Sequence, residues 1–185
     1  MKRMDKVMEA AKSMITCNET RVVQTHRILP PDLNDHQTLF GGKLMSYIDD
    51  TASISVSRFA RTNDIVTASM DELHFIHPVK PGHSVCVETY VTGAGHTSVE
   101  VFAKVLGEEL LTGERYIAAT SFITFVIVGL SKDQTLPRIH SESNEEQMVC
   151  GEYQDRKERR LADRSANEKL VKAISILPPW ISKGN

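Results

Sequence analysis

Residues 43–60, KLMSYIDDTASISVSRFA, decide the fold, because they carry apolar side chains at helical spacing directly after Gly41 and Gly42. With about 100° between successive residues, one arc of about 160° holds Leu44, Met45, Ile48, Ala52, Val56, Phe59 and Ala60. Asp49 falls inside this arc, whereas Asp50 points to the polar side. The sequence therefore predicts one long helix with a single carboxylate on its apolar face.

Two interpretations of Asp49 remain open from the residues alone. In the first, the carboxylate lies at the margin of the buried face and accepts hydrogen bonds from a neighbouring strand. In the second, its reduced hydration suits it to take a proton from water or to attack a carbonyl carbon. Gly41 and Gly42 likewise fit either a helix cap and turn, or exposed backbone N–H groups that hold an oxyanion.

Outside the helix, the hydrophobic period is that of strands. Residues 21–29, RVVQTHRIL, predict a strand that ends at Pro30 and Pro31, and a polar loop over residues 32–40 follows it. Four more strands are predicted at residues 65–77, 84–91, 98–106 and 115–128, with short separators rich in glycine and proline. Short connections favour antiparallel pairing, so we expect an α+β fold in which one helix packs against an antiparallel sheet.

The faces of these strands differ. Strands 84–91 and 98–106 alternate valine with polar residues, which predicts one buried and one solvated face. The last strand contains IAATSFITFVIV, which is apolar on both faces, so we expect another subunit to cover its second face.

Length and composition exclude several protein classes. A chain of 185 residues fits one domain, and we place it at residues 17–130. We expect an N-terminal helix or extension at residues 1–16 before it and a charged, helical tail at residues 131–185 after it. A net charge of -2 gives no reason to expect nucleic acid or an anionic membrane as partner. Cys17, Cys86 and Cys150 are far apart in sequence and form no CxxC motif, which argues against a disulfide framework and a metal site. No signal peptide or membrane span is apparent, so we expect a cytoplasmic protein.

Four segments together resemble the acyl-CoA thioesterases of the hotdog fold, both the bacterial acyl-CoA hydrolases and their mammalian cytosolic brain-type relatives. They are LPPDLNDHQTLFGGKLMSYIDDTA, VTASMDELHFIHPVKPG, HTSVEV and LTGERYIAATSFITFV, in the order that the family has them. The resemblance runs from about residue 22 to residue 128. It implies a long central helix wrapped by an antiparallel sheet, a homodimer with a continuous sheet, and often a trimer of such dimers.

The resemblance also implies a site. Its catalytic pair is an Asn in the loop before the helix and an Asp inside it, which match Asn34 and Asp49, and the pair meets across the dimer interface. The coenzyme A portion of the substrate lies along positions that match Ala68, Ser69, Met70, Thr97, Ser98 and Val99. No cofactor is implied, since coenzyme A is part of the substrate. One departure is Gln37, which replaces a Gly that many relatives have in the loop.

We therefore expect hydrolysis of acyl-CoA to fatty acid and coenzyme A, with Asp49 as general base or nucleophile, Asn34 from the partner, and the amides near Gly41 and Gly42 as oxyanion donors. One alternative is a hotdog hydroxyacyl-thioester dehydratase or hydratase, which usually needs a His, although His36, His74 and His77 all lie off the helix. The other alternative is a non-catalytic acyl-CoA sensor.

Overall fold

A computed structural model describes residues 14–131 and 135–177 of the chain. The chain divides into two compact units after Cys150. The first unit therefore extends beyond the domain boundary that the sequence places near residue 130. Residues 1–13, where the sequence predicts most of the N-terminal helix, lie outside the described residues.

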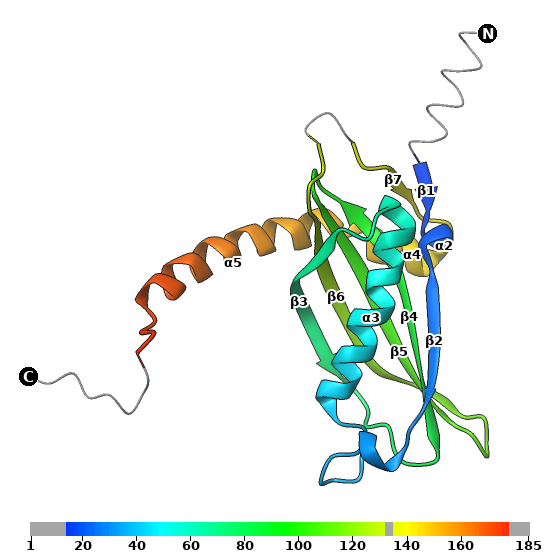
Figure 1. Cartoon of the computed structure of the whole chain (residues 1–185). Coiled ribbons are helices and arrows are strands. Elements are labelled where there is room, and N and C mark those ends of the chain that lie inside the picture. Colours follow the sequence, from blue (N-terminus) through cyan, green and yellow to red (C-terminus); the bar gives the residue numbers. More distant parts are fainter. Residues whose placement is uncertain (1–13, 132–134, 178–185) are drawn as a thin grey trace, which may run out of the picture. The chain divides into compact units, whose positions relative to one another are not determined.

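The core of the first unit is a five-stranded antiparallel sheet with one long helix on it (Figure 1). The strand order is β2-β4-β5-β6-β3, and the strands are β2 (Val22–Arg27), β3 (Ile65–Phe75), β4 (His83–Ala94), β5 (Ser98–Glu109) and β6 (Arg115–Ile127). Helix α3 (Gly41–Ala60) packs its apolar stripe on one face, and Ile48, Val56 and Phe59 are buried against the sheet. The predicted α+β fold, with its helix and five strands, is thus confirmed.

Part of the second face of the sheet, over β4 and β5, is covered by short elements from both ends of the first unit. Strand β1 (Met14–Thr16) pairs in parallel with β7 (Arg138–His140), α2 (Cys17–Thr20) follows β1, and α4 (Asn144–Gly151) follows β7. A second cluster of buried residues forms there from Cys17, Tyr90, Phe102 and Val149.

Two sequence predictions are corrected here. Strands β4 and β5 do not have a solvated face along their length, because the aromatic rings of Tyr90 and Phe102 lie opposite the valine-lined face and need cover of their own. Residues 14–16 form a strand rather than the end of a helix, because they pair with β7.

The second unit contains helix α5 (Tyr153–Ala173), which confirms the helix expected in the charged tail. Ion pairs at i,i+4 spacing join Glu152 to Arg156 and Arg164 to Glu168 along it. Among the described residues, no helix is both long and apolar enough to cross a membrane.

Candidate active site

Helix α3 begins with exposed donors. Its N-cap residue is Phe40, whose side chain offers no hydrogen-bond acceptor, and no described residue accepts a hydrogen bond from the backbone N–H of Gly41 or Gly42. A side chain at position 41 would lie against the Phe75 ring, whose Cζ would be 3.5 Å from the added Cβ. The absence of a side chain at Gly41 thus leaves its N–H group open to a ligand that carries a partial negative charge.

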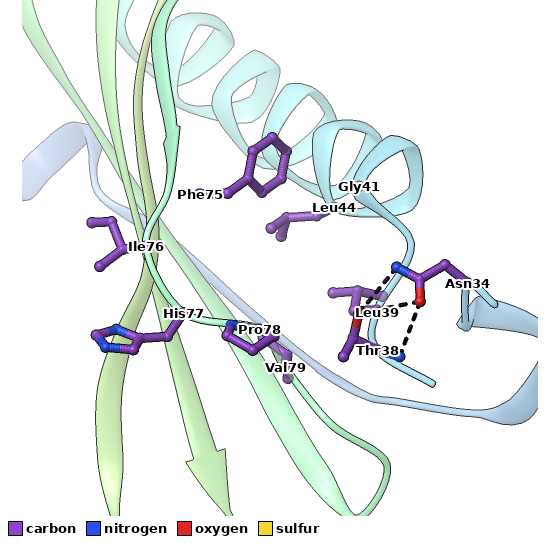
Figure 2. A pocket seen from close by; sticks show the side chains of 10 residues that line it. All are labelled: Asn34, Thr38, Leu39, Gly41, Leu44, Phe75, Ile76, His77, Pro78 and Val79. Atoms are coloured by element: carbon purple, nitrogen blue, oxygen red, sulfur yellow. Dashed lines mark hydrogen bonds between the residues drawn. The ribbon is translucent and has the colours of Figure 1, made fainter. Parts of the chain in front are cut away.

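Asn34 lies beside this helix start, in a loop that its own side chain holds together (Figure 2). Its Oδ1 accepts from the backbone N–H groups of His36 (2.9 Å) and Thr38 (3.2 Å), and its Nδ2 donates to Thr38 Oγ1 (3.0 Å). Two backbone hydrogen bonds close the same loop, one from the Asn34 N–H to the Thr38 carbonyl (2.9 Å) and one from the Gln37 N–H to the Asn34 carbonyl (3.0 Å). One of the two Nδ2 hydrogens remains for a ligand, since an amide nitrogen has two donors.

The loop, the helix start and the end of β3 enclose a cavity of about 340 Å³. Its lining is mostly apolar, and consists of Asn34, Thr38, Leu39, Gly41, Leu44, Phe75, Ile76, His77, Pro78 and Val79. Two of the four predicted catalytic positions, Asn34 and Gly41, therefore share one cavity, with Gly42 adjacent in sequence.

Gln37 turns the loop with a left-handed backbone, at a φ of 57°. This conformation disfavours residues with a side chain, and it is the physical reason why a glycine suits the position. With Gln37 in place of this glycine the turn still forms, but the backbone at residue 37 is strained.

Asp49 lies on α3 about two turns after Gly41, and it contacts the sheet. Its Oδ1 accepts a hydrogen bond of 2.7 Å from Thr67 Oγ1 on β3. The Asp49 side chain is half-buried, whereas Asp50 is exposed, as the helical spacing predicts. This contact is the hydrogen bond from a neighbouring strand that the first interpretation required, and it leaves Asp49 Oδ2 for other partners.

Within one chain, Asp49 and the Asn34 cavity are apart. Eight residues of helix separate Gly41 from Asp49, which is about 12 Å of axial rise. A thioester carbonyl that meets both an oxyanion donor and a general base must lie about 3 Å from each. A single chain therefore does not bring the two halves of the predicted site to one carbonyl group.

Strand β3 is an edge strand, and some of the apolar side chains on it and just after it are exposed. It lies at one end of the strand order, and Val66, Phe75 and Ile76 are about half exposed along or just after it. Such an unpaired apolar edge is a template for another strand. Asp49 and the cavity both adjoin this strand, Asp49 through Thr67 and the cavity through Phe75.

The six residues predicted to bind coenzyme A come together at one end of the sheet. Ala68 is exposed and Ser69 and Met70 are half-buried, beside a register shift in β3 that lies between Thr67 and Ser69. Residues 97–99 lie at the start of β5, where Thr97 and Ser98 are half-buried and Val99 is buried. Phe125 of β6 pairs with Thr67 on one side and Val99 on the other, so only β6 separates the two segments.

Sequence reasoning missed one polar residue at the site, Thr67, and it named another, His77, for the dehydratase alternative. No sequence pattern marks Thr67 beyond its place on the strand that follows the helix. It meets Asp49 only because α3 packs on β3. His77 lines the cavity, but its Nδ1 lies 2.9 Å from the Ile117 carbonyl, and its ring points away from Asn34 in Figure 2. Within the described parts of the chain, no cluster of three His, Cys, Asp or Glu side chains could hold a metal ion.

Comparisons with known proteins converge on one family. A family model described as "Thioesterase superfamily" matches residues 36–113. The uncharacterized acyl-CoA thioester hydrolase YkhA of Bacillus subtilis is 47% identical over 165 residues, which cover 89% of this chain and 95% of that protein.

Solved structures agree with this result. The acyl-CoA hydrolase of Bacillus cereus superposes with a TM-score of 0.81 at 44% identity, over 87% of this chain and 98% of that one. The acyl-CoA hydrolase of Staphylococcus aureus, solved with butyryl coenzyme A, coenzyme A and coenzyme A disulfide, superposes with a TM-score of 0.79 at 29% identity, over 86% of this chain and 98% of that one. Variants of the S. aureus enzyme, each with one Asp, Thr or Asn replaced by Ala, have also been characterised. A hexameric acyl-CoA thioesterase superposes with a TM-score of 0.77 at 36% identity, over 83% of this chain and 98% of that one.

Proposed function

This chain belongs to the thioesterase superfamily of acyl-CoA thioester hydrolases, and from that premise we propose that it hydrolyses acyl-CoA to a free acid and coenzyme A at a site shared by two subunits. The observation that carries the proposal is the division of the site within one chain. Uncapped amides and Asn34 lie at one end of β3, and a carboxylate held by Thr67 lies at the other.

Asp49 is the general base or the nucleophile. The Thr67 hydroxyl fixes its Oδ1, so Oδ2 is the oxygen that takes a proton from water or attacks the thioester carbonyl carbon. Partial burial reduces the hydration of the carboxylate, which makes either step easier. Asp50 is one residue away but exposed, and it has no part in the reaction.

The start of α3 stabilises the oxyanion. The N–H groups of Gly41 and Gly42 and the positive end of the helix dipole favour the negative charge that develops on the carbonyl oxygen. Asn34 orients the substrate or the attacking water with its remaining Nδ2 hydrogen, while its other hydrogen bonds keep the loop in place. These donors need no rearrangement at the moment of reaction.

The two halves meet when a second copy adds its β3 strand to the first. If two β3 strands pair antiparallel about a twofold axis near Asp71, Thr67 of one chain lies opposite Phe75 of the other, because both are four residues from the axis. Asp49, bound to Thr67, then faces the partner's cavity. The homodimer contains two complete sites, and three such dimers would make the hexamer that a relative forms.

Coenzyme A binds along residues 68–70 of β3 and 97–99 of β5 in this proposal. These segments lie at the end of the sheet where Thr67 is, so the nucleotide portion extends from the catalytic carboxylate rather than from the chain's own cavity. The acyl chain then enters the partner's apolar cavity.

The decisive experiment measures thiol release from acyl-CoAs of C2 to C18 chains by wild type, Asp49→Ala and Asp50→Ala. Asp49→Ala should lower kcat by about 10² to 10⁴, as the loss of a general base commonly does. Asp50→Ala is the matched control and should stay within a few-fold of wild type. Near-normal turnover by a folded Asp49→Ala protein would refute the proposal.

One observation favours a dehydratase or hydratase as the second candidate, namely that His77 lines the cavity. An absorbance change of an enoyl thioester without release of free thiol would support this candidate instead. Stoichiometric binding of acyl-CoA with neither change would support a sensor.

A further inference from the structure

The cluster on the second face of the sheet contains two cysteines that are distant in sequence but adjacent in space. Cys17 begins α2 and Cys150 is the penultimate residue of α4, yet their Sγ atoms lie 3.6 Å apart. Both thiols are reduced, and the third cysteine, Cys86, lies on β4. We propose that Cys17 and Cys150 form a redox-modification site, which closes to an intramolecular disulfide when a peroxide is the oxidant.

The short separation is compatible with a disulfide. An S–S bond is about 2.05 Å long, so the two sulfur atoms need to approach by only about 1.6 Å. Cys150 lies in the last turn of α4, which ends at Gly151, and a helix end can adjust by this amount more easily than a helix interior. Cys17 has 0% exposure and is packed among Tyr90, Phe102 and Val149, so it is the fixed member of the pair.

Polar contacts hold α4 in place over the sheet and keep the pair together. Arg21 forms ion pairs with Glu88 on β4 and with Glu146 on α4, and Lys104 on β5 binds Glu145 at 2.9 Å. The two cysteines thus stay adjacent whether or not they are bonded, and oxidation does not require an encounter between mobile segments.

Exposure assigns the two chemical roles. Half-buried Cys150 meets the peroxide first: its sulfur is oxidised to a sulfenic acid while the peroxide is reduced and leaves as water. Cys17 Sγ then attacks the sulfur of Cys150, and the S–S bond forms as the hydroxyl group leaves with the Cys17 proton as a second water. Contact with Cys150, followed by burial, raises the pKa of the Cys17 thiol, so Cys17 is the resolving rather than the first-reacting group.

The test uses the full-length chain, reduced and then treated with hydrogen peroxide at neutral pH. After alkylation in denaturant, alkylated cysteines should fall from three to one, with Cys86 the one that remains, and dithiothreitol should restore all three. A non-reducing digest should join the peptide of Cys17 to that of Cys150. The oxidised chain should also unfold at a higher temperature, because the bond closes a long loop.

Variants separate the pair from the third thiol. Cys86→Ser should lose two alkylatable thiols on oxidation, as wild type does, and Cys150→Ser should form no intramolecular crosslink. A crosslink through Cys86, a crosslink between chains, or over-oxidised Cys150 beside an unmodified Cys17 would overturn the proposal. The wild-type digest decides the question even if a variant at Cys17 fails to fold.

Discussion

Subunit complementation tests the shared site most directly. Asn34→Ala and Asp49→Ala each remove one half of the proposed site, and each homodimer should be nearly inactive in thiol release. When the two variants exchange subunits, a mixed dimer joins the intact Asn34 of one chain to the intact Asp49 of the other. It therefore regains one complete site of two.

The expected magnitude follows from the separation along α3. Because about 12 Å of helix rise separates Gly41 from Asp49, no site can be completed within one chain. Random exchange in an equimolar mixture makes about half of the dimers mixed, and each has one working site, so the mixture should recover about a quarter of wild-type activity.

The assay is release of free thiol from one acyl-CoA, measured before and after subunits have exchanged by mild dissociation or co-expression. As the matched control, Asp49→Ala mixed with the double variant Asn34→Ala/Asp49→Ala should recover nothing, since no combination contains a complete site. If the two single variants exchange subunits and yet show no more than their separate activities, the proposal of a site shared by two chains is wrong.

Three further outcomes are expected. Thr67→Val should lower kcat about 10-fold through loss of the hydrogen bond to Asp49, whereas Thr67→Ser should retain most activity; equal kcat for both variants would exclude a positioning role for the hydroxyl. Gln37→Gly should raise the free energy of unfolding in urea by about 0.5–1 kcal/mol, because Gln37 has a φ of 57°. A free energy of unfolding below that of wild type would contradict this. Burial would raise the pKa of Glu146, but hydrogen bonds from the backbone N–H groups at positions 142 and 143, together with Arg21, hold it below its usual 4.5. This carboxylate thus stabilises the fold above pH 4.5, and the stabilisation is lost as the pH falls through its lowered pKa. Glu146→Gln should therefore be less stable than wild type at pH 7 by about 1–3 kcal/mol, and the difference should shrink in acid. A difference in stability that does not change with pH would argue against a stabilising charge on Glu146.

The elements of the sheet and the helix could be predicted because their signals are local. The spacing of Leu44, Ile48, Ala52 and Val56 specifies α3, and the same spacing separates half-buried Asp49 from exposed Asp50. The strand boundaries could be predicted from the glycine and proline residues that separate them. Because these separators are short, they also favour antiparallel pairing. These features depend on residues within a few positions of one another, which is the range over which a sequence pattern is informative.

What the sequence did not predict depends on contacts between distant residues. Cys17 and Cys150 are adjacent only because β1 pairs with β7 and brings both ends of the first unit onto one face of the sheet. The same cover explains why Tyr90 and Phe102 are buried where a solvated face was expected. Thr67 meets Asp49 through the packing of α3 on β3. Alternation along a strand shows which residues share a face, but it does not show what covers that face.

The uncapped start of α3 links ligand occupancy to folding. Most helices satisfy one of their first N–H groups with a Ser, Thr, Asp or Asn side chain at the N-cap, and the N-cap residue of α3 is Phe40 instead. A carbonyl oxygen that accepts from Gly41 or Gly42 supplies the missing cap, so in the proposed site the substrate completes the helix. By mass action, a ligand that binds there raises the free energy of unfolding by RT ln(1 + [L]/Kd). The helix that supports the fold is then most stable when the enzyme is occupied.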